Sequence, residues 1–108
     1  MRPCTTTTSG VSTSSPIPLD IVQVPFNVSL STIVTGAVVY TIQHTFDDIY
    51  ASDYNPASGV WYNHDNSVFV NATANGNDNF SAPVTACRIN QTAGAGSVQL
   101  KAIQGILY

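Results

Sequence analysis

Apolar and polar residues alternate along much of the chain with a period of two. The clearest run covers residues 37–46. Its apolar face carries Val38, Tyr40, Ile42, His44 and Phe46, and its other face carries Ala37, Val39, Thr41, Gln43 and Thr45. Successive side chains of a β-strand point to opposite faces of the sheet, so this run predicts a strand with one strongly apolar face.

Shorter runs on both sides repeat this pattern. Residues 17–30 read as two strands, or as one long strand with a bulge near Val22 and Gln23. Further strands are predicted within residues 67–73, 84–91 and 98–102, and a glycine-rich hairpin turn at residues 93–96 is expected to join the last two. Cys87, Ile89, Val98 and Leu100 should point inward, and Arg88 and Asn90 outward.

Six or seven short strands separated by turn signals predict an all-β fold, an antiparallel β-sandwich that is jelly-roll-like. A chain of 108 residues is long enough for one such domain and too short for two. Residues 1–15 consist mainly of threonine, serine, glycine and proline, which bury too little apolar area to offset the loss of chain entropy. We therefore expect a flexible N-terminal arm over residues 1–15, ordered only against a neighbour, and a single β-sandwich domain over residues 16–108.

The charge of the chain limits its possible partners. Six acidic residues, all of them aspartates, and three basic residues give a net charge of −3. Three scattered cations cannot neutralise the phosphates of a nucleic acid or attach the chain to an anionic membrane. No apolar run is long enough to span a bilayer, and no hydrophobic segment of the signal-peptide type follows Met1, so we expect the chain to stay in the cytosol. Because a charge-poor surface favours association, much of this surface is expected to be covered by neighbours.

No pattern of residues points to catalysis or to a cofactor. The residues that invite a metal site lack the ligand spacing of zinc or calcium sites; they are His44, His64, Asp47, Asp48 and Asp65. We interpret His44 as the end of a core-facing strand and His64 as part of a polar loop, while Asp47 and Asp48 cap or turn the chain after the strand. No Gly-x-Ser-x-Gly motif is present. The chain is therefore expected to be no enzyme and to need no metal or cofactor.

The two cysteines, Cys4 and Cys87, could form one bridge, but a cytosolic origin favours reduced thiols. Cys87 shares the alternation with Ile89, so we interpret it as a small apolar residue of the core.

The segment 47–66 is long for a loop in a compact domain, and such loops are usually functional. It contains four candidate interface residues, which are Tyr50, Tyr54, Trp61 and Tyr62. Tyrosine and tryptophan are enriched at the centres of protein interfaces. Arg88, the charged residue inside an apolar strand, is a fifth candidate. It either points to solvent and pairs with an aspartate such as Asp48, or forms an ion pair with another subunit.

Three segments resemble a family of small virion proteins of tailed bacteriophages. They are Tyr40–Asp48, Trp61–His64, and Pro83–Thr92 continuing to Gly96–Val98 and Ile103–Gln104, so that the resemblance covers roughly residues 37–104. The family differs at Cys87, where a larger aliphatic residue is expected. The resemblance implies a non-enzymatic capsid cement or decoration protein in the virion, assembled in the host cytoplasm. Its partners would be the major capsid protein and further copies of itself in a homo-oligomer.

A second function class remains open. The aromatic residues of the segment 47–66 lie beside asparagine and aspartate, and sugar-binding sites combine aromatic rings with polar side chains. The alternative is therefore a carbohydrate- or receptor-binding β-module of a virion component, such as a head or tail fibre.

Overall fold

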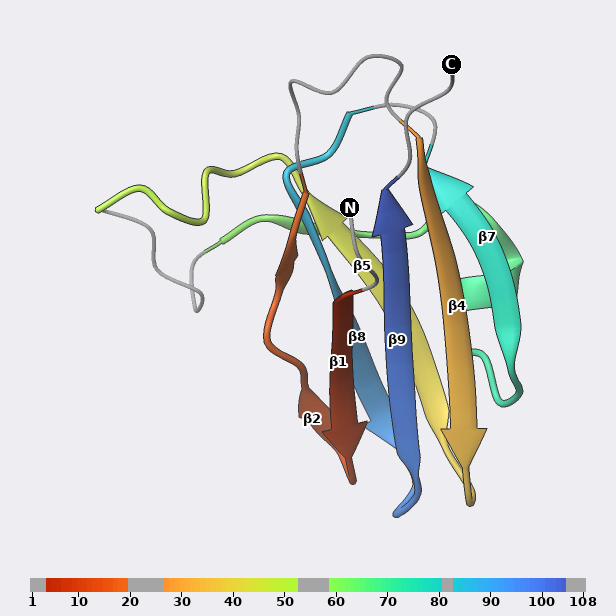
Figure 1. Ribbon diagram of the computed structural model, residues 1–108. Helices are drawn as coiled ribbons and strands as arrows, with labels where there is room; N and C mark the ends of the chain where they lie inside the picture. Colours follow the sequence, from red (N-terminus) through yellow and green to blue (C-terminus); the bar gives the residue numbers. More distant parts are fainter. Residues whose placement is uncertain (1–3, 20–26, 53–58, 81–82, 105–108) are drawn as a thin grey trace.

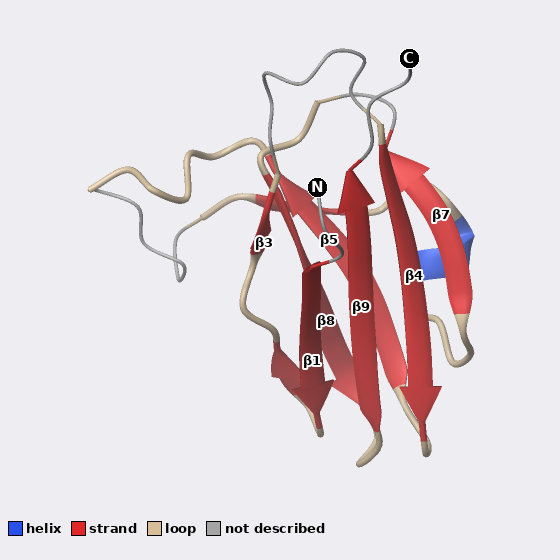
Figure 2. Ribbon diagram, viewed as in Figure 1, coloured by secondary structure: helices blue, strands red, loops and turns tan. Residues whose placement is uncertain are grey.

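The computed structural model describes residues 4–19, 27–52, 59–80 and 83–104, and in these residues the chain is an all-β sandwich (Figures 1 and 2). The strands are β1 (Cys4–Ser9), β2 (Ser12–Thr13), β3 (Ile17–Pro18), β4 (Val28–Thr35), β5 (Val39–Thr45), β6 (Trp61–Asn63), β7 (Gly76–Phe80), β8 (Ala86–Ala93) and β9 (Ser97–Gln104). A single turn of 3₁₀ helix, η1 (Ser67–Phe69), lies between β6 and β7. The predicted antiparallel β-sandwich is confirmed.

The strands form two sheets that pack face to face (Figure 1). One sheet has the order β1-β9-β4-β7, and the other has the order β2-β8-β5-β6 with β3 also paired to β8. All of these pairs are antiparallel. The pairing is nested, because β1 pairs with β9, β2 with β8, β4 with β7, and β5 with β6.

The period-two pattern of the sequence accounts for the core between the sheets. Alternate residues of β4, β8 and β9 are buried, and most of the predicted inward positions are fully buried; these include Tyr40, Ile42, Cys87, Ile89, Val98 and Leu100. Arg88 and Asn90 are less buried than their neighbours, as expected for outward positions. The hydroxyl of Tyr40 remains satisfied inside the core, since it lies 2.6 Å from the Thr32 hydroxyl and donates to the Ala74 carbonyl at 2.7 Å.

The expectation of a flexible N-terminal arm is wrong for the described residues 4–15. β1 forms a full antiparallel ladder with β9, from Cys4 opposite Ala102 to Ser9 opposite Ser97. The backbone of β1 therefore finds hydrogen-bond partners that the composition does not reveal. In addition, the buried Thr8 hydroxyl donates to the side-chain oxygen of Gln91 in the opposite sheet, at 2.8 Å. Backbone pairing and this buried hydrogen bond, rather than apolar burial, order the segment.

Three other expectations of local structure are corrected. Residues 67–69 form a 3₁₀ turn instead of a strand, because the Asn66 side chain accepts a hydrogen bond from the Val68 N–H and caps the turn. The glycine-rich segment 93–96 is not a hairpin, since β8 and β9 belong to different sheets. Phe46, predicted to face the core, is exposed beyond the end of β5. The possible bulge near Val22 and Gln23 lies outside the described residues.

Three connections between the sheets meet at the lower end of the sandwich in Figure 1; they follow β1, β4 and β8. The Gly10 N–H donates to the Gly96 carbonyl, and the Gly96 N–H donates to the Ala37 carbonyl, both at 3.0 Å. The buried side-chain amide of Gln91 donates to the carbonyls of Gly94, at 3.1 Å, and Gly96, at 3.0 Å. These hydrogen bonds join the three connections to one another.

The contact between the connections predicts that Gly94→Ala costs more stability than Gly10→Ala. Both glycines have positive φ, +92° and +69°, so both substitutions strain the backbone. A Cβ on Gly94 would lie 2.2 Å from the Ala37 carbonyl oxygen, whereas a Cβ on Gly10 meets no atom within 4 Å. Chemical denaturation should show Gly94→Ala losing about 1–3 kcal/mol more than Gly10→Ala. Equal losses would contradict the close packing of the connections.

The core predicts large losses on truncation of Ile42 and Leu100, which are fully buried in facing sheets. Each change to alanine should lower the free energy of unfolding by about 2–5 kcal/mol, because it removes apolar contacts and leaves a cavity. Ile33→Ala, at a half-exposed position of β4, is the control and should stay within about 1 kcal/mol of the wild type. Small losses at both core positions would mean that the core lies elsewhere.

Candidate functional site

Strands β5 and β7 finish at the same end of the sandwich (Figure 1). This end carries an exposed apolar cluster. The exposed fractions of its members are 59% for Phe46, 77% for Tyr50, 52% for Val60 and 50% for Tyr62. We call these four residues the aromatic end. The rings of Phe46 and Tyr62 contact each other with centroids 5.7 Å apart. Large apolar side chains grouped in this way on a small domain commonly mark a site of interaction.

Hydrogen bonds at the end of β5 create this exposure. The Thr45 hydroxyl donates to the Val60 carbonyl at 2.7 Å, and it accepts a hydrogen bond from the Asp47 N–H at 3.1 Å. The Asp47 carboxylate accepts a further hydrogen bond from the Val60 N–H at 2.8 Å. The chain therefore turns away from β5 after Thr45, and Phe46 lies beyond the edge of the core. Asp48 continues the turn by accepting from the Tyr50 N–H at 3.0 Å, which confirms that Asp47 and Asp48 turn the chain.

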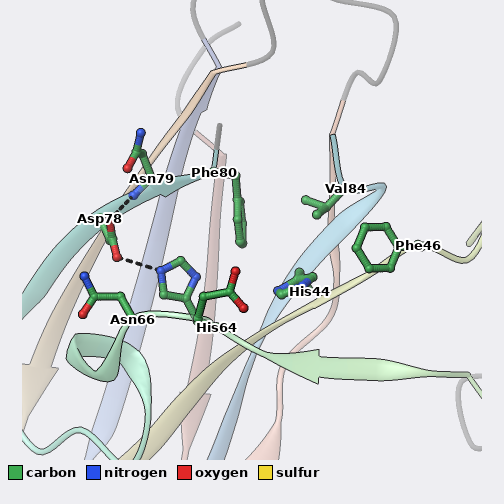
Figure 3. Close-up of a pocket in the computed structure, with 9 residues that line it drawn as sticks. His44, Phe46, His64, Asn66, Asp78, Asn79, Phe80 and Val84 are labelled. Carbon is green, nitrogen blue, oxygen red and sulfur yellow. Dashed lines mark hydrogen bonds and ion pairs between the residues drawn. The ribbon is translucent and has the colours of Figure 1, made fainter. Parts of the chain in front are cut away.

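Phe46 lines two hollows at this end of the sandwich. The first hollow, shown in Figure 3, has a volume of about 320 Å³. Its described lining combines charged, amide and aromatic side chains, which are His44, Phe46, His64, Asp65, Asn66, Asp78, Asn79, Phe80 and Val84. The second hollow, of about 380 Å³, is more apolar and is lined by Leu19, Phe46, Asp48, Ile49, Tyr50 and Thr85.

The first hollow contains a histidine–aspartate pair. The Nε2 atom of His64 lies 2.8 Å from a carboxylate oxygen of Asp78 (Figure 3). The other oxygen of Asp78 accepts a hydrogen bond from the Asn79 N–H at 2.8 Å. The hydrogen bond from His64, more than any other contact, lowers the pKa of Asp78 below its ordinary value, so this carboxylate is ionised at neutral pH.

His44 lies in an aromatic environment beside this pair. Its ring packs against Tyr62, with centroids 6.0 Å apart, and edge-on against Phe46 and Phe80. Burial lowers the pKa of His44 below its ordinary value of 6.5, although the Asp65 carboxylate acts in the opposite direction. His44 ends a core-facing strand as predicted, because β5 stops one residue later and the ring is 8% exposed.

Four of the five candidate interface residues are described, and they fall on two surfaces. Tyr50 and Tyr62 belong to the aromatic end. Trp61 and Arg88 lie together on the outer face of the sheet that contains β5, β6 and β8, where the guanidinium carbon of Arg88 lies 4.1 Å from the centre of the Trp61 ring. Arg88 also donates to the Gln43 side chain at 3.0 Å, while its pairing with an aspartate, in this chain or another, stays a prediction. Tyr54 lies outside the described residues.

The sequence interpretation missed the central residues of the first hollow. His64, expected in a polar loop, is buried and hydrogen-bonded to Asp78, and Asp78 itself lies in β7, a strand that the sequence pattern does not predict. The signal for β7 is weak because Gly76–Phe80 reads GNDNF, in which only the last residue is apolar. The apolar Phe80 is the better sequence signal for this strand. In the structure its ring contacts both His44 and His64.

Cys87, a further reactive group, is buried in the core opposite His44 in the β5–β8 ladder. Burial raises the pKa of the Cys87 thiol to about 12, so Cys87 remains a protonated core residue at neutral pH, as its predicted core position requires.

Within the described residues, no three histidine, cysteine or acidic side chains lie close enough together to hold a metal ion. No helix in the same part of the chain is long and apolar enough to cross a membrane.

Comparisons of the chain with protein-family models, with curated proteins and with solved structures gave no match.

The buried histidine predicts a loss of stability in mild acid. Because the folded pKa of His44 is depressed, the unfolded chain binds more protons once the pH falls below 6.5, and the free energy of unfolding must then decrease. His44→Phe keeps the ring contacts and removes this titration. Its denaturation free energy should therefore change less than that of the wild type between about pH 8 and pH 5.

His64→Phe is the matched control for this experiment. It removes the hydrogen bond to Asp78 and should destabilise the domain already at neutral pH, by about 1–3 kcal/mol. An unchanged acid sensitivity of His44→Phe would assign the effect to other groups.

Proposed function

We propose that this chain is a non-enzymatic structural subunit of a bacteriophage particle, a head cement or decoration protein that binds the shell of major capsid protein. The observation that carries the proposal is the aromatic end, which leaves four large apolar side chains in solvent beside two hollows. A partner that covers Phe46 and Tyr62 would remove this apolar area from water, which favours association.

The resemblance of residues 37–104 to small virion proteins of tailed phages supports the choice of partner. The low charge of the chain supports it as well, since charged residues make up 8% of the sequence. Charged residues are depleted at the centre of protein interfaces, whereas tyrosine, phenylalanine and tryptophan are enriched. A subunit that sits on a repeating lattice also needs only weak contacts, because multiple attachment raises its effective affinity.

The nested strand pairing gives a further argument. We infer that the fold is a jelly roll, because this winding pairs the first strand with the last and continues inward in the same way. Jelly rolls are common in viral capsid proteins and in lectins. This support is an analogy of fold, and the function itself rests on the exposed surface.

The second surface, around Trp61 and Arg88, offers a separate contact. It lies on the outer face of the sheet that contains β5 and β8, whereas Phe46 of the aromatic end lies beyond the last residue of β5. One chain could therefore bind the capsid shell through the aromatic end and another copy of itself through the Trp61–Arg88 face. This arrangement agrees with the proposed homo-oligomer.

Phe46→Ala tests the proposal. The side chain is more than half exposed, so the variant should fold, while its occupancy on phage heads should fall by a factor that corresponds to more than about 1 kcal/mol. Ile33→Ala, which truncates an exposed apolar residue of β4, is the matched control and should bind normally. Occupancy is measured by sedimenting particles with labelled protein and by their resistance to heat.

Normal occupancy of Phe46→Ala would contradict the proposed contact. If the wild type binds no particles but binds immobilised glycans, and Phe46→Ala loses that binding, the alternative of a carbohydrate-binding module replaces the proposal.

A further inference from the structure

The first hollow is rich in hydrogen-bond acceptors and in negative charge. Its described lining contains the carboxylates of Asp65 and Asp78 and no lysine or arginine. Asp65 is exposed at the hollow, and the Asp78 side chain keeps 19% of its surface accessible. An ionised carboxylate only accepts hydrogen bonds, so these two groups call for a donor.

The histidine of the hollow adds a third acceptor. Because Asp78 is ionised, the Nε2 atom of His64 must be the donor in their 2.8 Å hydrogen bond. In the neutral ring, Nδ1 then carries a lone pair instead of a proton. His64 is only 6% exposed, and its Nδ1 atom has no hydrogen-bond partner in the described structure. Figure 3 shows this nitrogen on the side of the ring that faces His44, away from Asp78.

The aromatic rings of the hollow favour a flat cation. Phe80 and Phe46 both line it, and the centroids of their rings lie 5.4 Å and 5.6 Å from that of His44. The face of an aromatic ring attracts a cation within about 6 Å, and guanidinium does so more often than ammonium because it is planar and weakly hydrated. The chain already makes such a contact elsewhere, where Arg88 lies 4.1 Å above Trp61.

We propose that the first hollow binds the guanidinium group of an arginine side chain that belongs to the protein covering the aromatic end. This inference rests on the proposed function, in which that protein is the major capsid protein. The guanidinium donates to Asp65 and Asp78, with the Nδ1 lone pair of His64 as a third acceptor, and it lies against the ring of Phe80 or Phe46. A volume of about 320 Å³ is at the lower end for ligand pockets, which suits one side chain.

The second hollow, which shares Phe46 with the first, indicates a further property of the partner. Among the described residues, its lining contains Leu19, Ile49 and Tyr50 and a single carboxylate, that of Asp48. The segment that covers Phe46 should therefore carry an arginine for the first hollow and an apolar side chain for the second.

The test uses a titration of the whole chain with Nα-acetylarginine amide, followed by amide chemical shifts in NMR. Saturable shifts are expected at Asp65, Asp78 and Asn79. The citrulline derivative, which has the same shape without the charge, should shift them at least about fivefold less at equal concentration. The lysine derivative should also bind more weakly, because its ammonium group cannot match the planar arrangement of acceptors.

Asp65→Asn distinguishes binding in the first hollow from the general attraction of a cation to a negatively charged protein. It should weaken binding of the arginine derivative by about fivefold or more, since it removes a charge and keeps the shape of the side chain. Asp48→Asn removes an equivalent exposed charge at the second hollow and should leave binding unchanged. Equal binding of the citrulline or lysine derivative, or unchanged binding by Asp65→Asn, would overturn the assignment.

The same measurements distinguish this inference from the proposed function. If Phe46→Ala no longer binds particles while the arginine derivative does not bind the wild type, the proposed capsid contact is supported and the arginine site is contradicted. If the derivative binds in the first hollow but the wild type does not bind particles, the guanidinium site is supported and the capsid protein is contradicted as the partner. Saturable shifts produced by a neutral monosaccharide, and none by the arginine derivative, would make the hollow a sugar site and overturn the proposal.

Discussion

The contact between three chain connections at one end of the sandwich determines how the two sheets are held together. Each connection carries the chain from one sheet to the other, so their relative positions set which strands face each other. Gly94 and Gly96 allow the carbonyls of Ala37 and Thr35 to approach so closely that no side chain would fit. The buried amide of Gln91 then bonds to the same turn, and its oxygen accepts from Thr8 in the opposite sheet. Because the side chains of Gln91 and Thr8 are buried, losing one of them would leave the other without its hydrogen-bond partner.

The opposite end of the sandwich has the reverse character. There the chain leaves β5 through hydrogen bonds among Thr45, Asp47 and Val60, and the side chains that follow point into solvent. One end thus maintains the order of the strands, and the other presents Phe46 and its two hollows from a rigid scaffold. A rigid frame with interaction residues at the ends of its strands is a common way for β-sandwiches to build a binding surface.

The alternation of apolar and polar residues predicted which side chains of a strand are buried. It did not predict features that depend on residues far away in the sequence. Ile42, Cys87 and Leu100 are buried as expected, because burial on a pleated strand follows from position parity. β1 was missed because threonine carries no apolar signal, while its order comes from a ladder with β9 about ninety residues later in the chain. The turn at residues 93–96 was misread because glycine marks a turn but does not say which sheet the next strand joins. The pair of His64 and Asp78 escaped notice because the two residues meet only when β6 and β7 are brought to the same end by their partners β5 and β4.

The pairing of the first strand with the last also has a consequence for folding kinetics. During synthesis β1 leaves the ribosome long before β9, so it must wait while most of the domain is made. Pairings between strands far apart in the sequence close large loops and form slowly. An unpaired strand of valine and isoleucine would readily add to another chain during this delay, because exposed apolar strands promote aggregation. The residues of β1 that follow Cys4 are threonine and serine only, which keep β propensity without an apolar face. The polar composition that makes this segment look like an arm therefore also protects the chain until its last strand arrives.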